Sequence, residues 1–376
     1  MNSQRPIWPS LVFVALVALL GGFARYLFAS QELLWLDELH TSWTVNGSLG
    51  DVHERANIGN QTPFYFWVNW FSVQLLGHSE ISLRLVSLFA SIATIIAAGW
   101  IVLRWTGSTP GAVLTAILIA LNTQFIYYGS EARPFALVQL LGILQVFLFW
   151  RAFTSINDQA PHSKQPAWML AIVSALLLYS HYTSVWVFVP ELLFVSFWFI
   201  VDSKFRSHFW IRLSSTSLLT FLLCVPALLQ LKSLFARRSN WESVSSIQGV
   251  IDDQVMPFGL WIAIPFIVLL IGPRKSGDSD QQSRSAFDFP SSKALFVFLW
   301  AIIPIVGVIA LEYFDVAPIA LTRYTLVGAV AFPIFAGLML GRIEKRKTRI
   351  GMAAGLIAIS LVYLSLIHIS EPTRPY

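Results

Sequence analysis

The sequence contains little charge and a single cysteine. Only 12% of its 376 residues are charged, whereas a soluble domain carries about 25%. Cys224 lies in an apolar run, so a disulfide within the chain and a cysteine-based metal site are both excluded. Hydrophobic residues make up 56% of the chain, and its mean hydropathy is +0.66. Because so few polar side chains cannot cover a fold of this size, lipid must be its solvent.

The formal net charge of +5 does not indicate nucleic-acid binding. The Lys and Arg residues lie in short segments between apolar runs, a pattern typical of residues that orient a chain in a membrane. The sequence also has no P-loop. We therefore expect the lipid bilayer, and no nucleic acid, among the partners.

Apolar runs of about the length of a membrane-spanning helix recur along the chain. They predict an all-α fold, a polytopic transmembrane bundle of about 11 spans. The expected spans are 8–29, 84–103, 111–128, 135–151, 167–180, 182–201, 209–229, 257–272, 292–311, 319–341 and 350–366. The run 167–201 is too long for one helix and is divided at the polar cluster 180–184. No cleavage site follows the first run, so we expect an uncleaved span there rather than a signal peptide.

The distribution of charge predicts how the chain crosses the membrane. With the N-terminus in the cytoplasm, the inner loops hold 16 Lys and Arg residues and the outer loops hold 8, as the positive-inside rule requires. Twelve of the 20 acidic residues fall on the outer side and are mixed there with a few arginines. The mixture predicts a site at the extracytoplasmic face of a multi-pass inner (plasma) membrane protein.

We expect one transmembrane domain over residues 1–363. It has a first outer loop at 30–83, a second outer loop at 230–256 and a polar cytoplasmic linker at 273–291. The aromatic, amphipathic segment 63–77 within the first outer loop is expected to lie in the membrane interface.

The last residues of the chain resemble a translated piece of non-coding DNA. Residues 364–374 match the translation of a common sequencing adapter. We therefore expect the natural sequence to stop near Tyr363, with 364–376 an artefactual tail and the true C-terminus missing.

Two adjacent carboxylates, Asp37 and Glu38, follow the first span. At a membrane surface the members of such a pair repel each other and are expected to be partly desolvated. A carboxylate there can serve as a general base or a metal ligand. The alternative is an acidic pair that only stabilises a helix N-terminus. A divalent metal would need Asp37, Glu38 and a histidine, but no metal-ligand spacing is convincing, and no cofactor is certain.

Arginines recur in the same outer segments. Arg133 follows Glu131 in a tight turn, Arg237 and Arg238 lie in the second outer loop, and Arg323 starts a span. Arginine can bind a phosphate through two parallel hydrogen bonds. The structural alternatives are an Arg133–Glu131 pair, contact with lipid headgroups, and snorkelling to the interface.

Other outer residues could contact a substrate or only support the fold. Thr62 and Pro63 fit the start of a helix, with Thr62 as N-cap. The substrate-binding candidates are Thr62, Tyr65, Arg84, Glu131, His181, Tyr182 and Tyr324. A single histidine such as His181 is more often structural than a ligand.

Taken in order, these motifs resemble the GT-C glycosyltransferases of the protein mannosyltransferase and aminoarabinose transferase superfamily. The matching pieces are Asp37-Glu38, Thr62-Pro63-Phe64-Tyr65, Gly77 with Arg84-Leu85, Glu131-Ala132-Arg133-Pro134-Phe135, and Arg323-Tyr324. The resemblance covers most of 8–341.

The resemblance implies transfer of a sugar from a polyprenyl-phosphate carrier, outside the cytoplasm and with inversion at the anomeric carbon. It implies that Asp37 is the base or the carboxylate that orients the acceptor, with Glu38 beside it. By the same resemblance, Arg133 and Arg323 are candidates for binding the donor phosphate. Arg237 and Arg238 are further candidates because they form a basic pair in the second outer loop. The sugar stays open, and so does the acceptor, which is a glycan, a lipid or a protein.

The sequence departs from the family at one informative position. Aminoarabinose transferases have a lysine just before the proline of the aromatic helix, where this chain has Thr62. That departure argues against aminoarabinose transfer. A transporter or lipid flippase is the alternative function, although paired broken helices and inverted repeats, its usual signs, are not evident. A scaffold subunit without chemistry is a third alternative.

Overall fold

A computed structural model describes residues 8–154, 167–201, 203–236, 246–271, 292–343 and 345–369. Within them every regular element is a helix. The longer ones are α1 (Trp8–Gln31), α5 (Glu80–Thr106), α6 (Thr109–Leu121), α8 (Phe135–Thr154), α9 (Ala167–Ser180), α10 (Phe188–Val201), α11 (Ser203–Ala236), α13 (Met256–Ile271), α14 (Ser292–Tyr313), α16 (Ala331–Arg342) and α17 (Arg346–Ile369). The shorter ones are α2 (Leu36–Val45), α3 (Leu49–Ile58), α4 (Phe64–Leu76), α7 (Thr123–Ser130), η1 (Tyr182–Val187), α12 (Ile247–Val250), η3 (Ile251–Val255), η4 (Thr322–Tyr324) and α15 (Leu326–Ala329).

The helices form a polytopic membrane bundle. Among the described residues, seven helices are long and apolar enough to cross a membrane, or eight if the bent pair α6 and α7 counts as one span. Two shorter apolar helices, Trp168–Ser180 and Leu326–Arg342, complete the pattern. Together with α13 they follow the predicted spans in order, and the break predicted at 180–184 falls between α9 and η1. The predicted linker 273–291 and the last residues of the expected tail, 370–376, lie outside the described residues.

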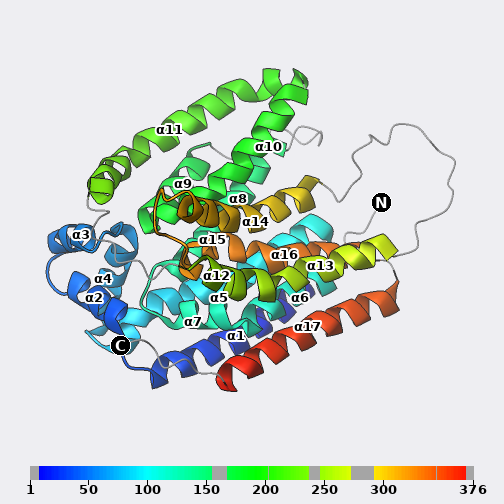
Figure 1. Cartoon of the computed structure of the whole chain (residues 1–376), viewed down its shortest axis with the longest axis horizontal. Helices are drawn as coiled ribbons and strands as arrows, with labels where there is room; N and C mark the ends of the chain where they lie inside the picture. Colours follow the sequence, from blue (N-terminus) through cyan, green and yellow to red (C-terminus); the bar gives the residue numbers. More distant parts are fainter. Residues whose placement is uncertain are drawn as a thin grey trace.

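The predicted first outer loop is a small helical subdomain at one end of the bundle. Helices α2, α3 and α4 gather at the left of Figure 1, beside one end of α11. Buried Val52, Tyr65 and Phe66 of this subdomain share an apolar core with Leu83 of α5 and Ala132 of the α7–α8 turn. The subdomain is therefore packed onto the ends of the spans that carry the predicted site.

The start of α4 differs from the prediction. We expected Thr62 to cap this helix, but α4 begins at Phe64 with Pro63 in the N-cap position, and no side chain caps it. Pro63 lacks an N–H and fits a helix start, and its carbonyl accepts a hydrogen bond from the Trp67 N–H at 2.9 Å. The Thr62 side chain is thereby left for another contact.

A buried arginine stabilises the break between α6 and α7. The two helices meet at an angle of 64°, which leaves the last α6 carbonyls without intrahelical partners. Arg25 of α1, fully buried, donates to the carbonyls of Ile119 and Ala120 at 2.9 and 3.3 Å and to Ser91 Oγ at 2.7 Å. Its positive charge lies at the negative end of α6. On the other side of the break, Asn122 caps the N-terminus of α7. Both helix ends at the break are therefore satisfied within the protein, and α7 leads directly to the turn at 131–134.

Candidate active site

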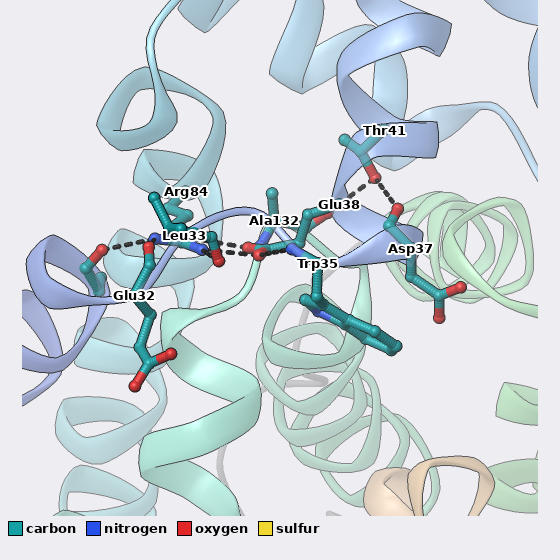
Figure 2. A network of polar contacts seen from close by, with 9 residues as sticks. Glu32, Leu33, Trp35, Asp37, Glu38, Thr41, Arg84 and Ala132 are labelled. Carbon is teal, nitrogen blue, oxygen red and sulfur yellow. Dashed lines mark hydrogen bonds and ion pairs between the residues drawn. The ribbon is translucent and has the colours of Figure 1, made fainter. Parts of the chain in front are cut away.

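The two adjacent carboxylates of α2 point in different directions. Figure 2 shows Glu38 directed toward Arg84, while the side chain of Asp37 extends away from that pair. The Glu38 side chain is 1% exposed and that of Asp37 is 29% exposed. The sequence predicted one acidic pair, but the helix separates a buried carboxylate from an accessible one.

Glu38 and Arg84 form a closed ion pair. Arg84 Nε and Nη2 donate to the two carboxylate oxygens of Glu38 at 2.7 and 2.6 Å. The other Arg84 N–H groups donate to the backbone carbonyls of Ala29, Glu32 and Leu33. These five hydrogen bonds use all five donors of a guanidinium group. Arg84 therefore joins the end of α1 to α2 and has no donor left for a substrate.

Glu38 also fixes the turn that carries Arg133. Its Oε1 accepts a hydrogen bond from the Ala132 N–H at 2.8 Å, and Thr41 Oγ1 donates to the Ala132 carbonyl at 2.8 Å. Residues three apart on a helix share a face, so α2 holds both polar backbone groups of Ala132. The next residue, Arg133, is thereby directed at Asp37.

Asp37 is the point on which two arginines converge. Arg133 Nη2 lies 3.5 Å from Asp37 Oδ2, and Arg323 Nη1 lies 3.1 Å from the same oxygen. Charge-assisted hydrogen bonds are typically 2.7–2.9 Å long, so both contacts are loose beside the Glu38–Arg84 pair. The three residues come from α2, the α7–α8 turn and η4, and they form a partly exposed cluster of two cations and one anion.

Most of the partners of Arg133 are neutral groups, so its positive charge is only partly compensated by its surroundings. With the Gln61 amide oxygen facing the guanidinium, that oxygen accepts from both Nη1 and Nη2 at 2.9 Å. Nη1 also lies 3.3 Å from the Asp37 carbonyl. The side chain is 6% exposed, and its Nε has no hydrogen-bond partner among the described residues. A buried cation with an unused donor can bind an anion.

Arg323 is held in an aromatic and polar setting. Its guanidinium lies 5.4 Å from the ring centre of Tyr324, a cation–π distance. Tyr324 in turn packs against the His181 ring, with 5.3 Å between centres. On the other side, Thr322 Oγ1 donates to Asp253 Oδ2 at 2.6 Å. The loop carrying Arg323 is thus attached to both η1 and η3.

The remaining predicted residues lie around this cluster or behind it. Tyr65 is buried, and its hydroxyl pairs with Ser87 Oγ at 3.0 Å, so it supports the fold. Glu131 is 2% exposed, beside Arg133 in the same turn, and its carbonyl accepts from the Arg133 N–H at 2.8 Å. Tyr182 starts η1.

Some predicted residues lie beyond what the structure describes. Arg237 and Arg238 lie outside the described residues. Within the described ranges, no group of three His, Cys, Asp or Glu side chains is placed to hold a metal ion.

His181, which packs against Tyr324 beside the cluster, is neutral. Burial lowers the pKa of its ring to about 3, helped by the positive charges of Arg133 and Arg323. The Thr183 N–H donates to Nδ1 at 3.3 Å, which leaves the proton of the neutral ring on Nε2. Because the folded pKa lies below the unfolded value, this group contributes stability above about pH 6.5 and loses it as the pH falls toward 3.

We expect the His181 ring to stay unprotonated throughout the physiological range. In ¹⁵N-histidine spectra of the purified protein, the signal that disappears in His181→Gln should not move between pH 5 and 8. A midpoint near pH 6.5 for that signal would contradict the burial of the ring near the two arginines.

Sequence reasoning missed two groups that shape the site. Gln61 was passed over although it precedes Thr62, because an uncharged amide is informative only when its partner, Arg133, is known. Asp253 was passed over because it lies far from η4 in the sequence and meets Thr322 only in the fold. A polar residue in the second outer loop was the available signal for Asp253.

The arrangement of the helices is the GT-C type of transmembrane bundle that the sequence predicted. It is similar to the structure of ArnT from Cupriavidus metallidurans bound to undecaprenyl phosphate, with TM-score 0.63 and 14% identity over 99% of this chain and 67% of that one. ArnT in the apo state gives TM-score 0.61 and 15% identity over 97% and 65% of the two chains. The apo oligosaccharyltransferase of Archaeoglobus fulgidus gives TM-score 0.53 and 13% identity over 98% and 56%. The chain thus spans about two thirds of the length of ArnT.

No protein-family model and no curated protein sequence matches the chain. The similarity to the solved structures therefore shows the fold alone.

Proposed function

We infer that the protein is a membrane glycosyltransferase that moves a sugar from a polyprenyl-phosphate carrier to an acceptor hydroxyl at the extracytoplasmic face, with inversion at the anomeric carbon. The observation that supports this most is the convergence of Arg133 and Arg323 on the accessible carboxylate of Asp37. Lipid-phosphate chemistry is also consistent with the fold, because the similar ArnT structure holds undecaprenyl phosphate.

The three residues can perform such a transfer without a nucleotide. Asp37 accepts the proton of the acceptor hydroxyl while the acceptor oxygen bonds to the anomeric carbon. The bond from that carbon to the phosphate oxygen breaks, and its electron pair leaves with the phosphate. The transition state resembles an oxocarbenium ion, and the growing negative charge on the phosphate is stabilised by the two guanidinium groups.

Unsatisfied hydrogen-bond donors also favour an anionic ligand. Trp35 Nε1, Thr62 Oγ1 and Arg133 Nε are buried without a partner among the described residues. They lie within two residues of Asp37 or Gln61, or in the cluster itself. Buried polar groups are rarely left unpaired, so these donors are available to the oxygens of a ligand that reaches them.

The alternative function, transport or lipid flipping, has one observation to consider. The bent pair α6 and α7 is a broken helix of the kind found in transporters. Its free backbone groups, however, are bonded by Arg25 and capped by Asn122. They are used within the protein, so the break favours a structural role.

Transfer from a synthetic polyprenyl-phosphate sugar tests the proposal. Membranes containing the protein should release polyprenyl phosphate and glycosylate an endogenous acceptor, and Arg323→Gln should lower kcat/KM by about 100-fold. Arg104→Gln, an exposed arginine at the far end of α5, serves as the matched control and should leave the rate unchanged. Equal rates in wild type and Arg323→Gln would remove Arg323 from the site, and transport of the intact donor without cleavage would favour the alternative.

A further inference from the structure

Asp37 occupies the position at which two arginines could bind a phosphate. Both guanidinium groups reach one oxygen of its carboxylate, Oδ2, at 3.1 and 3.5 Å. A phosphate oxygen bound between the same two groups needs the same point in space. The carboxylate and a phosphate are therefore alternative ligands of one arginine pair.

The contrast with Glu38 shows which carboxylate can leave its partners. Glu38 is 1% exposed, and two short bonds tie it to Arg84, with a third from the Ala132 backbone. Asp37 is 29% exposed, and one oxygen is shared between two longer contacts. Exposed, loosely paired ions gain little from their pairing, so an incoming anion can replace Asp37 but not Glu38.

Resting on the proposed function, we propose that Asp37 competes with the donor phosphate for Arg133 and Arg323, and that donor binding releases the carboxylate to act as base. Binding of the donor thereby activates the base. Before the donor binds, the arginine pair holds Asp37 as an anion that is turned away from an acceptor hydroxyl. After it binds, the freed carboxylate faces the acceptor with its proton-accepting oxygens available.

The charge of the cluster is balanced once the donor binds and stays balanced through the transfer. Arg133, Arg323 and Asp37 sum to +1, and a phosphodiester donor of charge −1 brings the sum to zero. When the sugar leaves, the phosphate gains one negative charge while Asp37 gains one proton. The sum stays at zero through the transfer, so no uncompensated charge develops in a partly buried site.

Binding of a lipid phosphate to Asp37→Asn distinguishes two roles of Asp37, competition with the phosphate and positioning of the two arginines. If Asp37 competes with phosphate, Asp37→Asn binds farnesyl phosphate about 3- to 10-fold more tightly than wild type, because the competing anion is gone. If Asp37 instead anchors the arginines for the ligand, Asp37→Asn binds more weakly. Arg133→Gln and Arg323→Gln should each weaken binding by about 10-fold or more.

The measurement is equilibrium binding of farnesyl phosphate, farnesol and inorganic phosphate to purified protein in detergent. Glu54→Gln, an exposed carboxylate on α3, removes the same charge from the same outer subdomain and should bind like wild type. Weaker or unchanged binding by Asp37→Asn overturns the competition.

If the proposed function itself is wrong, the binding of the wild-type protein shows it, independently of the Asp37 variant. If wild type binds farnesyl phosphate no better than farnesol, the site does not recognise a lipid phosphate at all. If wild type binds inorganic phosphate more tightly than farnesyl phosphate, the ligand is a free phosphate and not a lipid phosphate. Melting temperatures of all variants, measured in parallel, show that each is folded.

Discussion

Replacing Asp37 by Asn should lower the rate of sugar transfer by about 100- to 10,000-fold, the range that a general base contributes. The amide keeps the size of the side chain and can still accept from Arg133 and Arg323, but it cannot take up the proton of an acceptor hydroxyl. The effect should therefore fall on kcat. Because Asp37 is partly exposed and only loosely paired, the melting temperature should change little.

The transfer assay with a synthetic polyprenyl-phosphate sugar measures this directly. Glu54→Gln is the control for the loss of one negative charge in the same subdomain. If Asp37→Asn turned over as fast as wild type, Asp37 would not be the base, and Asp253 near Arg323 would become the next carboxylate to test.

Replacing Glu38 by Gln should destabilise the fold and not only the chemistry. The change leaves the guanidinium of Arg84, 2% exposed, without a counter-charge, and breaking a buried ion pair costs about 3–5 kcal/mol. The same change weakens the bond to the Ala132 N–H, which positions Arg133. We expect a lower free energy of unfolding and, in the protein that still folds, a slower transfer.

A double-mutant cycle separates the ion pair from the rest of the network. Glu38→Gln combined with Arg84→Gln should lose less stability than the sum of the two single variants, because no charge is then left buried alone. Additive losses, measured by thermal unfolding in detergent, would show that Glu38 and Arg84 do not act as a pair. Glu54→Gln should again match wild type.

The two predictions divide the acidic motif into two roles. Asp37 should affect turnover far more than stability, and Glu38 should affect both. The family resemblance implied a catalytic role for Asp37 and described Glu38 only as its neighbour. The difference follows from the direction of two adjacent side chains on α2 (Figure 2).

The sequence by itself determined the class of fold and the order of its membrane spans. A chain with 12% charged residues and repeated apolar runs has no other solvent than lipid, and the GT-C resemblance was carried by short motifs in order. Only the structure decided which residues meet. Asp37, Arg133 and Arg323 are far apart in the chain and are brought together by α2, by the turn that Ala132 fixes and by η4.

The sequence could not separate Asp37 from Glu38, or assign Arg84 to the scaffold and Arg133 to the site. Each choice depends on burial and on the direction of a side chain, which are set by helices distant in sequence. Hydropathy is a sum over neighbouring residues and predicts the spans. A cluster of two cations and one anion is a property of contacts, and only the packed chain has those.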